Sequence, residues 1–178
     1  MKLGDKMSEP LIIDRVPVEG SFPAGGVVEV WTINRPNKLN ALNNEVVAEL
    51  KAACKVAEDD ADVRVVVIRG ASPEPAEEGK RQKPPAFVAG ADITEFTGKK
   101  SKEIRANFEN NAWEAIWNLS IPTIASIDGF ALGGGSEIAL SCDLRIASTR
   151  SNFGTPEINL GLIPGGGATQ RLARLLGY

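Results

Sequence analysis

The sequence predicts an α/β fold with largely parallel sheets. Short runs rich in β-branched residues, of which Val63 to Arg69 is the clearest, alternate along the chain with segments whose apolar residues recur at helical spacing. Apolar residues also make up 43% of the 178 residues, which suits one globular domain with a substantial core. Strands and helices that alternate within one domain are typical of βα units, in which the strands pair in parallel.

The first predicted elements follow a polar leader, which we place at residues 1–25. Gly26 to Ile33 is expected to form a strand, and the Asn-Arg-Pro-Asn sequence after it ends that strand. A helix capped by Asn43 or Asn44 should then run to about Glu58. Its predicted apolar face consists of Val46, Val47, Leu50, Ala53, Cys54 and Ala57.

A buried strand, Val63 to Arg69, follows, and after it comes the polar segment Gly70 to Pro85. This segment is rich in Pro, Glu and Lys, so we expect a solvated loop, and a loop of such length is uncommon inside a compact domain. Lys80, Arg81 and Lys83 give it the charge to contact a nucleotide, but we favour disorder.

The second half of the chain continues the alternation without an internal repeat or a linker, which predicts a single domain over residues 26–178. Its expected elements are a strand Phe87 to Ala89, a helix from about Ser101 to Leu119 with Ile104, Phe108 and Ile116, a strand Pro122 to Ile127, a helix Gly134 to about Ser141, a strand Leu144 to Ala147 and a closing helix from about Ala168. Trp113 and Trp117 lie four residues apart on one helix face, which favours a core role over a site role. Asp128 and Asp143 are interpreted as turn and helix-end residues.

The absence of histidine restricts the chemistry of this chain. Ser-His-Asp and Cys-His catalysis are excluded, and so is any metal site with a histidine ligand. Proton transfer in an enzyme of this composition must use carboxylates, Lys, Tyr or Cys.

Charge, hydropathy and cysteine content exclude further classes. The net charge is only −3, which argues against a nucleic-acid partner. No apolar run is as long as a membrane span, and the N-terminal sequence has no hydrophobic secretory core. Cys54 and Cys142 fall in apolar segments as reduced core residues, without a CxxC metal motif, so we expect a cytoplasmic protein.

Two glutamates follow turn-forming sequences: Glu137 comes after Gly133-Gly134-Gly135-Ser136, and Glu157 comes after Gly154-Thr155-Pro156. Glycines that open a helix let bare N–H groups approach an anionic oxygen, and two carboxylates beside it can serve as acid and base. Taken alone, the glycines could equally form a tight strand-to-helix turn. Glu137 could likewise interact only with its own helix N-terminus, and Glu157 could be a surface carboxylate.

Four stretches, in order along the chain, resemble the crotonase (enoyl-CoA hydratase/isomerase) superfamily. They are Asn34-Arg35-Pro36 with Leu39-Asn40-Ala41-Leu42, then Phe87 to Ile93, then Ile121 to Glu137, and finally Phe153 to Glu157 running on to Pro164 and Gln170-Arg171-Leu172. The resemblance covers nearly everything from about residue 27. It implies the crotonase (ClpP-like) spiral of ββα units.

The resemblance also implies catalytic roles. The backbone N–H groups of Ala91 and Gly134 match the two donors that polarise the thioester carbonyl. Glu137 and Glu157 match the hydratase acid/base positions and would hold one water between them, with Glu157 as the main proton donor and acceptor and Glu137 orienting the water. The implied reaction is reversible hydration of a 2-enoyl-CoA to a 3-hydroxyacyl-CoA, a step of fatty acid metabolism.

The same resemblance implies the residues that contact the CoA thioester substrate. Ala89, Asp92, Ile93 and Thr94 would line the pantetheine and thioester channel, whereas Lys38, Leu39 and Asn40 match the stretch near the adenine end. Plain solvent exposure remains an alternative for Lys38. No cofactor is expected, because coenzyme A is part of the substrate. A short acyl chain such as crotonyl is mildly favoured, since Trp113 and Trp117 could restrict the pocket.

In one respect the sequence departs from the family pattern. Crotonase chains usually run well beyond the position of Tyr178, through a helical C-terminal region that covers the acyl pocket and contributes to trimer contacts. We expect either a fragment or a separate C-terminal piece, and a homo-oligomer (trimer or dimer of trimers) as the assembly.

Two rival functions remain open from the sequence. The first is another crotonase reaction, such as double-bond isomerisation or thioester hydrolysis, although members with these activities often lack one of the two glutamates. The second is an acyl-CoA-binding subunit without turnover.

Overall fold

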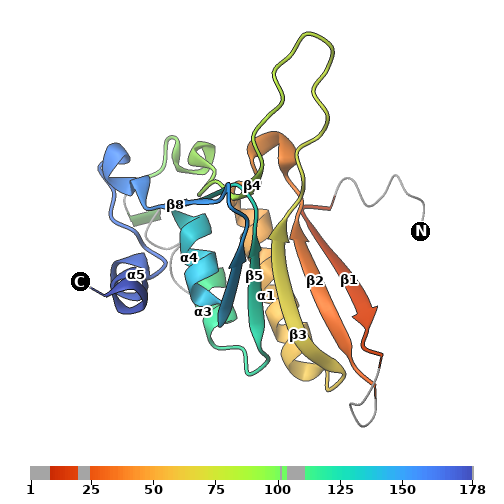
Figure 1. Ribbon diagram of the computed structural model, residues 1–178. Helices are drawn as coiled ribbons and strands as arrows, with labels where there is room; N and C mark the ends of the chain where they lie inside the picture. Colours follow the sequence, from red (N-terminus) through yellow and green to blue (C-terminus); the bar gives the residue numbers. More distant parts are fainter. Residues whose placement is uncertain (1–8, 20–24, 101, 104–110, 178) are drawn as a thin grey trace.

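The computed structural model describes residues 9–19, 25–100, 102–103 and 111–177. Two sheets form its framework (Figure 1): a five-stranded sheet in the order β1-β2-β3-β5-β7 and a three-stranded sheet in the order β4-β6-β8. With η marking short 3₁₀ helices, the elements are β1 (Leu11–Pro17), β2 (Val27–Ile33), η1 (Pro36–Lys38), α1 (Asn44–Asp59), β3 (Val63–Gly70), β4 (Ala86–Val88), η2 (Ile93–Phe96), α3 (Ala112–Trp117), β5 (Thr123–Ile127), β6 (Phe130–Leu132), α4 (Gly134–Ser141), β7 (Leu144–Ala147), β8 (Asn152–Gly154), η3 (Pro156–Leu160) and α5 (Ala168–Leu176).

The predicted α/β fold with largely parallel sheets is confirmed. Only the β1–β2 pair is antiparallel among the described strand pairs, and every other neighbouring pair in both sheets is parallel. The central strands β3 and β5 carry the β-branched residues that predicted them, which suits strands inside a sheet. The β3 register places Ile68 opposite Trp31 of β2 and Ala125 of β5, and all three side chains are buried.

The core lies between the five-stranded sheet and its helices. Figure 1 shows α1 behind this sheet, with α3 and α4 between the sheet and α5. The α1 face contributes Val46, Leu50, Ala53, Cys54 and Ala57 to the core, and Val47 packs against it partly buried, as the spacing predicted. Asn43 is the N-cap, because its side chain accepts a hydrogen bond from the Val46 N–H at 3.0 Å. Both cysteines are free and buried, as expected.

Within the predicted polar leader, the structure contains the strand β1. It pairs with β2 from Leu11↔Ile33 to Pro17↔Val27. Because β1 is an edge strand, most of its side chains stay partly or fully exposed, and its mixed composition hides the strand pattern. The strands β6 and β8, with three residues each, were likewise too short to show a period in the sequence.

The helix predicted from Ser101 to Leu119 is wrong as a single element. Residue 101 and residues 104–110, including Ile104 and Phe108, lie outside the described residues, but a new helix begins at Ala112. Asn111 before it has an extended backbone and caps the helix by accepting from the Glu114 N–H at 2.9 Å. The core role predicted for Trp117 is also wrong, because this side chain is 56% exposed, whereas Trp113 is buried.

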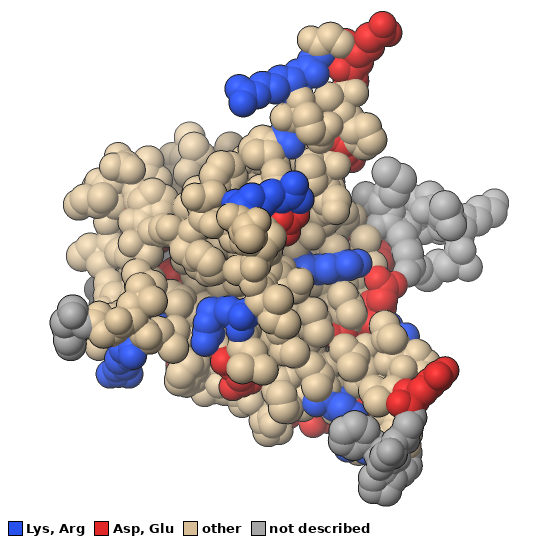
Figure 2. Space-filling model, viewed as in Figure 1, with Lys and Arg blue, Asp and Glu red and all other residues tan. Residues whose placement is uncertain are grey.

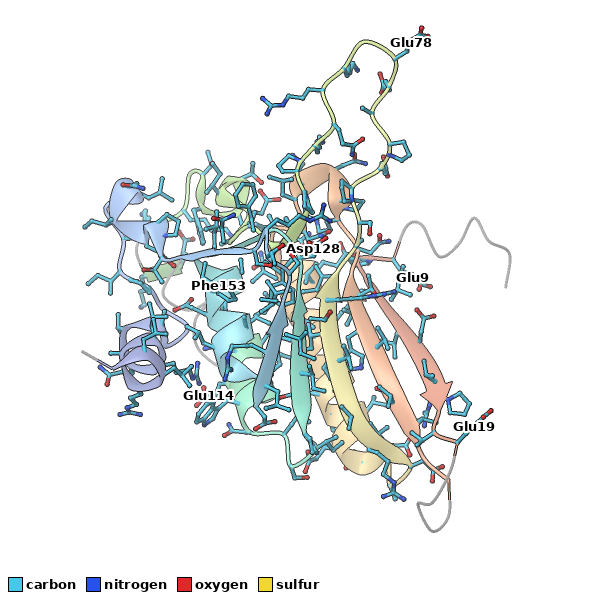
Figure 3. All side chains as sticks on the ribbon, in the orientation of Figure 1. Glu9, Glu19, Glu78, Glu114, Asp128 and Phe153 are labelled. Carbon is cyan, nitrogen blue, oxygen red and sulfur yellow. The ribbon has the colours of Figure 1, made fainter. Side chains whose placement is uncertain are left out.

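The Gly70 to Pro85 segment projects from the domain as a long loop with Glu78 at its tip (Figure 3). Gln82 closes the loop, since its amide donates to the Glu74 carbonyl at 2.7 Å and accepts from the Ala76 N–H at 2.8 Å. Lys83 donates to the Asn37 carbonyl at 2.8 Å. The segment therefore follows a defined path in the structure, with hydrogen bonds inside the loop and one to η1, and the disorder that we favoured stays a prediction.

The surface carries dispersed charge. On the face shown in Figure 2, Lys and Arg side chains alternate with Asp and Glu side chains, and no large area of one sign forms. Among the helices that the structure describes, none is long and apolar enough to cross a membrane.

Candidate active site

The glycine-rich turn before α4 brings bare backbone close to the three-stranded sheet. Gly133 has φ +51°, a conformation that L side chains rarely adopt, and its N–H donates to the Gly154 carbonyl of β8 at 2.8 Å. A Cβ on Gly135 would overlap with the Val88 carbonyl oxygen of β4. Glycine at these positions therefore lets α4 start at the point where β4 and β8 end.

Ala91 lies beside this glycine turn, on the segment between β4 and η2. It follows Gly90, whose φ is +115°, and Leu42 brackets it by donating to the Gly90 carbonyl at 2.8 Å and accepting from the Asp92 N–H at 2.7 Å. Within the described part of the chain, neither the Ala91 N–H nor the Gly134 N–H donates to a protein acceptor. Two unpaired donors thus remain for a ligand oxygen.

Trp113 of α3 fixes the start of α4. Its indole Nε1 donates to the Gly134 carbonyl at 2.8 Å, and its ring is so near that a Cβ on Gly134 would lie 3.0 Å from Cζ2. Trp113 is therefore both a core residue and a wall of the site, although the sequence favoured the core role over a site role.

The Glu137 carboxylate is held inside the protein, only 2% of the residue being exposed. Its Oε1 accepts hydrogen bonds from the Gly166 N–H at 2.7 Å and from the Ala168 N–H at 3.1 Å. Burial raises the pKa of Glu137, and the negative charge of Glu157 acts in the same direction, while the two N–H donors and Arg171 oppose the shift. Glu137 is thus oriented by backbone but disfavoured as an anion.

Glu157 lies in the first turn of η3 beside the glycine turn. Its Oε1 is so close to Gly133 that a Cβ built there would lie 3.1 Å away. Its Oε2 is buried and is the one buried side-chain nitrogen or oxygen atom, among the described residues, that has no hydrogen-bond partner. A buried polar atom without a partner is uncommon in proteins and calls for an explanation.

One cavity of about 140 Å³ brings these groups together. Ala91, Gly134, Glu137 and Glu157, the four predicted catalytic residues, all line it, and so do the predicted contact residues Ala89 and Ile93. Its other walls are largely apolar and come from Gly90, Phe96, Trp113, Gly133, Pro156, Leu160, Leu162, Ile163 and Gly165.

The remaining predicted contact residues do not line this cavity. Lys38 is exposed at the end of η1, and the Leu39 carbonyl accepts from the Ala89 N–H at 3.1 Å. Asn40 is 1% exposed, and its amide donates to the Ala71 and Ala86 carbonyls at 2.9 and 2.8 Å. Leu39 and Asn40 therefore hold neighbouring segments in place, and contact of this stretch with the adenine end of a ligand stays a prediction.

Asp92 and Thr94 also serve the local structure. The Asp92 carboxylate caps η2 by accepting from the Thr94 N–H and hydroxyl, and it accepts from the Arg35 guanidinium at 2.9 Å. These bonds lower the pKa of Asp92, the Thr94 hydroxyl contributing most. The network secures the turn that presents Ala91.

Sequence reasoning missed the turn that holds Glu137. The donors Gly166 and Ala168 belong to a second glycine triplet, Gly165 to Gly167, and this triplet was the signal that could have identified them. Leu160, Leu162 and Ile163 were missed because they lie in a segment without regular period.

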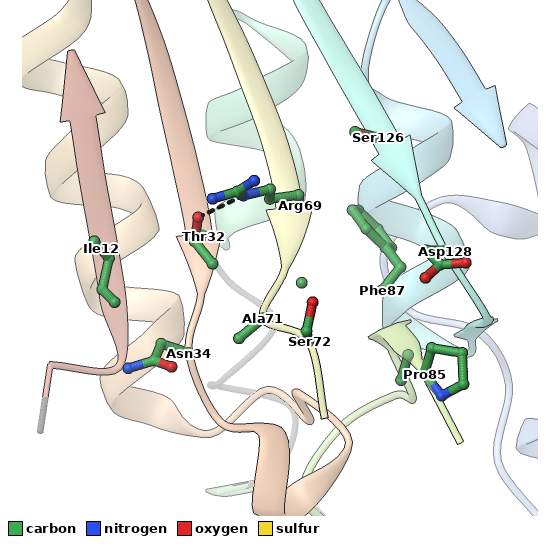
Figure 4. A pocket seen from close by; sticks show the side chains of 12 residues that line it. Ile12, Thr32, Asn34, Arg69, Ala71, Ser72, Pro85, Phe87, Ser126 and Asp128 are labelled. Carbon is green, nitrogen blue, oxygen red and sulfur yellow. Dashed lines mark hydrogen bonds between the residues drawn. The ribbon is translucent and has the colours of Figure 1, made fainter. Parts of the chain in front are cut away.

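A second concavity, of about 390 Å³, lies at the carboxyl ends of β2, β3 and β5 (Figure 4). Arg69 lines this concavity, where its side chain is exposed and its Nε donates to the Thr32 hydroxyl at 2.9 Å. Asp128 at the rim accepts from Arg150 and Ser148, which lowers its pKa to about 2. No pair of carboxylates faces this space, so we place the candidate active site in the smaller cavity. Among the described residues no group of three or more His, Cys, Asp or Glu could hold a metal ion.

Comparison with known proteins decides the family. The family model described as Enoyl-CoA hydratase/isomerase matches residues 24–178. The chain belongs to this family. In this member of the enoyl-CoA hydratase/isomerase family, Glu137 and Glu157 line the same cavity as Ala91 and Gly134, whose N–H groups are free.

Individual relatives agree with the family. The chain is 44% identical over 154 residues to the short-chain-enoyl-CoA hydratase of Clostridium acetobutylicum, an alignment that covers 85% of this chain and 55% of that protein. It is 40% identical over 150 residues to the crotonyl-CoA hydratase of Syntrophomonas wolfei, covering 83% of this chain and 54% of that protein.

A solved structure confirms the crotonase fold. The crystal structure of enoyl-CoA hydratase from Bacillus anthracis superposes with a TM-score of 0.78 at 33% identity, covering 95% of this chain and 59% of that one. This family member therefore spans little more than half the length of the relatives that it matches.

Proposed function

We propose that the protein catalyses the reversible syn hydration of a 2-enoyl-CoA to a 3-hydroxyacyl-CoA. One observation carries the proposal: Glu157 presents a buried Oε2 without a partner at a cavity that Glu137 also lines. A carboxylate oxygen left unpaired costs stability, and such a cost is typical of a group that waits for a water or substrate proton.

The two free N–H groups would bind the thioester carbonyl oxygen. Ala91 and Gly134 approach the cavity from separate segments, and Gly134 is the first residue of α4, so the positive end of the helix adds to its effect. As the enolate forms, negative charge develops on this oxygen, and the donors stabilise it most at that stage. Losing one such donor typically costs about 3–4 kcal/mol of transition-state stabilisation.

The carboxylates would then manage one water molecule. Glu137 orients the water and Glu157 accepts its proton while the water oxygen bonds to the β-carbon, and Glu157 returns a proton to the α-carbon of the enolate. The elements of water are added and both glutamates return to their starting states. The N–H groups of Gly166 and Ala168, which hold Oε1 of Glu137, support its orienting role.

The apolar walls support an acyl thioester as the substrate. Phe96, Trp113, Leu160 and Leu162 line the cavity around the polar groups, and its modest size favours a short acyl chain such as crotonyl. The relatives named short-chain-enoyl-CoA hydratase and crotonyl-CoA hydratase support the same substrate class. The proposed reaction needs no cofactor, because coenzyme A enters with the substrate.

The test follows the loss of the conjugated enoyl-thioester absorbance of crotonyl-CoA. Glu157→Gln should lower turnover by about 10²–10⁴-fold while substrate binding by calorimetry stays nearly unchanged. Glu78→Gln at the exposed loop tip is the matched control and should keep wild-type turnover. Binding of crotonyl-CoA by the wild type without any hydration would overturn the proposal in favour of a binding subunit.

Assembly and location are secondary parts of the proposal. We infer a homo-oligomer, a trimer or a dimer of trimers, in the cytoplasm, and light scattering of the purified protein checks the first part. A monomeric mass that hydrates crotonyl-CoA would show that assembly is dispensable for the chemistry.

A further inference from the structure

The turn that orients Glu137 is itself held from α5. Gly166 donates its N–H to Glu137, and its carbonyl on the other side of the turn accepts from Nη1 of Arg171 at 2.5 Å. The guanidinium also packs on the neighbouring glycine, since a Cβ built on Gly167 would lie 2.7 Å from Nη1. Gly167 has φ +101°, so glycine is required there both for conformation and for this close approach.

Arg171 is anchored at its outer side by an aromatic ring. Its guanidinium carbon lies 4.5 Å from the ring centroid of Trp117, within the range of a cation–π interaction. This contact gives a role to the exposed Trp117, which packs poorly into the core. Arg171 thereby links α3, α5 and the glycine turn through one planar group.

The charge of Arg171 acts on the same carboxylate. The charged groups that face Glu137 are Glu157 from η3 and Arg171 from α5. Glu157 raises the pKa of Glu137 and Arg171 lowers it, while Glu114 and Glu137 both favour the charged form of Arg171. Among the residues that the structure describes, only the two backbone donors would oppose the effect of burial on the pKa of Glu137 if Arg171 were removed.

We propose that Arg171 is a positioning residue of the active site, which fixes the Gly166–Ala168 turn and through it the orientation and charge of Glu137. Arg171 is not among the residues that line the cavity, so its effect passes through the turn. The inference rests on the proposed function for its kinetic consequences, but the structural linkage to Glu137 is independent of turnover.

The kinetic test compares Arg171→Met, Arg171→Lys and the control Arg174→Met. Arg174 lies on the same helix, is exposed, and has no hydrogen bond or ion pair to any described residue. With crotonyl-CoA, Arg171→Met should lower kcat by about ten- to hundred-fold with little change in KM, because small displacements of a reacting group cost that much. Arg171→Lys should recover part of the loss, and Arg174→Met should behave as the wild type.

The pH profile separates positioning from general weakening of the fold. Removing the positive charge should raise the pKa of Glu137, so the acid limb of kcat/KM should move to higher pH in Arg171→Met and stay near its wild-type position in Arg171→Lys. If Arg171→Met folds poorly, Trp117→Leu removes the stacking alone and should give a smaller loss of kcat. A wild-type kcat and acid limb in Arg171→Met would overturn the proposal.

A measurement without turnover distinguishes the two proposals. Carbon NMR titration of the Glu137 carboxyl, assigned by its loss in Glu137→Gln, should show a higher pKa in Arg171→Met than in the wild type or Arg174→Met. If the wild type does not hydrate crotonyl-CoA but this shift is present, the proposed function fails and the role of Arg171 stands. If hydration is present and the titration is unmoved, the role of Arg171 fails.

Discussion

Substitution of Gly133 by alanine should damage both the fold and the site through one added methyl group. Gly133 has φ +51° and ψ −123°, a backbone region that only glycine adopts easily, so the strain should cost about 1–3 kcal/mol of unfolding free energy. The new Cβ would also lie 3.1 Å from Oε1 of Glu157, closer than ordinary contact. Glu157 must then move by some tenths of an ångström, and kcat should fall by roughly ten- to hundred-fold.

The assay combines urea unfolding with hydration of crotonyl-CoA. Gly79→Ala is the matched control, because Gly79 also has a positive φ, +79°, but nothing lies within 4 Å of its added Cβ. The control should lose some stability and keep full activity. If Gly133→Ala loses stability but keeps wild-type kcat, the position of Glu157 does not depend on this turn.

Three further predictions concern stability and pH. Burial raises the pKa of Glu137, so the folded protein holds this proton more tightly than the unfolded chain does, and the stability of the wild type should fall as pH rises above about 4, near the ordinary pKa of a glutamate. In urea titrations Glu137→Gln should therefore gain stability relative to the wild type over this rise, and a difference that does not change with pH would contradict this. Trp113→Phe removes the hydrogen bond to the Gly134 carbonyl, so the free energy of unfolding should drop by at least about 1 kcal/mol and kcat by roughly ten-fold. A loss of stability at full kcat would show that Trp113 does not position the Gly134 N–H for the reaction. Arg150 and Ser148 lower the pKa of Asp128 to about 2, so its contribution to the stability of the fold is present at neutral pH and fades as pH falls below about 4. Asp128→Asn should therefore cost a few tenths of a kcal/mol of unfolding free energy at neutral pH and nothing in strong acid, with unchanged turnover.

Regular, buried elements were predictable from the sequence. The helix α1 and the strands β3 and β5 have boundaries within a few residues of those expected, because their apolar periods reflect burial on one face or on both. The strand β7 also has the expected bounds, although its side chains are largely exposed. β1 was missed since an edge strand needs no such pattern, and the helix break at Asn111 was missed since an asparagine cap looks like an ordinary polar position within a helical period.

Only part of the candidate site was predictable, for a similar reason. Ala91, Gly134, Glu137 and Glu157 belong to motifs with unusual local sequence, and the structure places all four around one cavity. The contacts that orient them come from elsewhere in the chain. Arg171, for example, acts on Glu137 across 34 positions of sequence through a glycine turn, and no local pattern encodes such a contact.

Asn40 illustrates how a motif residue can have another task. It was expected near the adenine end of the substrate, but its buried amide connects the segment after β3 with β4. Its oxygen also accepts from the Arg35 N–H at 3.0 Å, so this buried amide satisfies backbone groups of three segments at once. Asn40 of this motif therefore serves the fold, and its contact with the adenine end stays a prediction.

The central claim, that two carboxylates add water to a conjugated thioester, is tested most directly by the fate of the water oxygen. The protein is incubated with crotonyl-CoA in water enriched in heavy oxygen, and the products are analysed by mass spectrometry. Hydration by the two glutamates should place the label in the hydroxyl group at the β-carbon of an intact CoA thioester, at a rate that Glu157→Gln lowers by orders of magnitude. Label in a released carboxylate, or an unlabelled product with a shifted double bond, would contradict it.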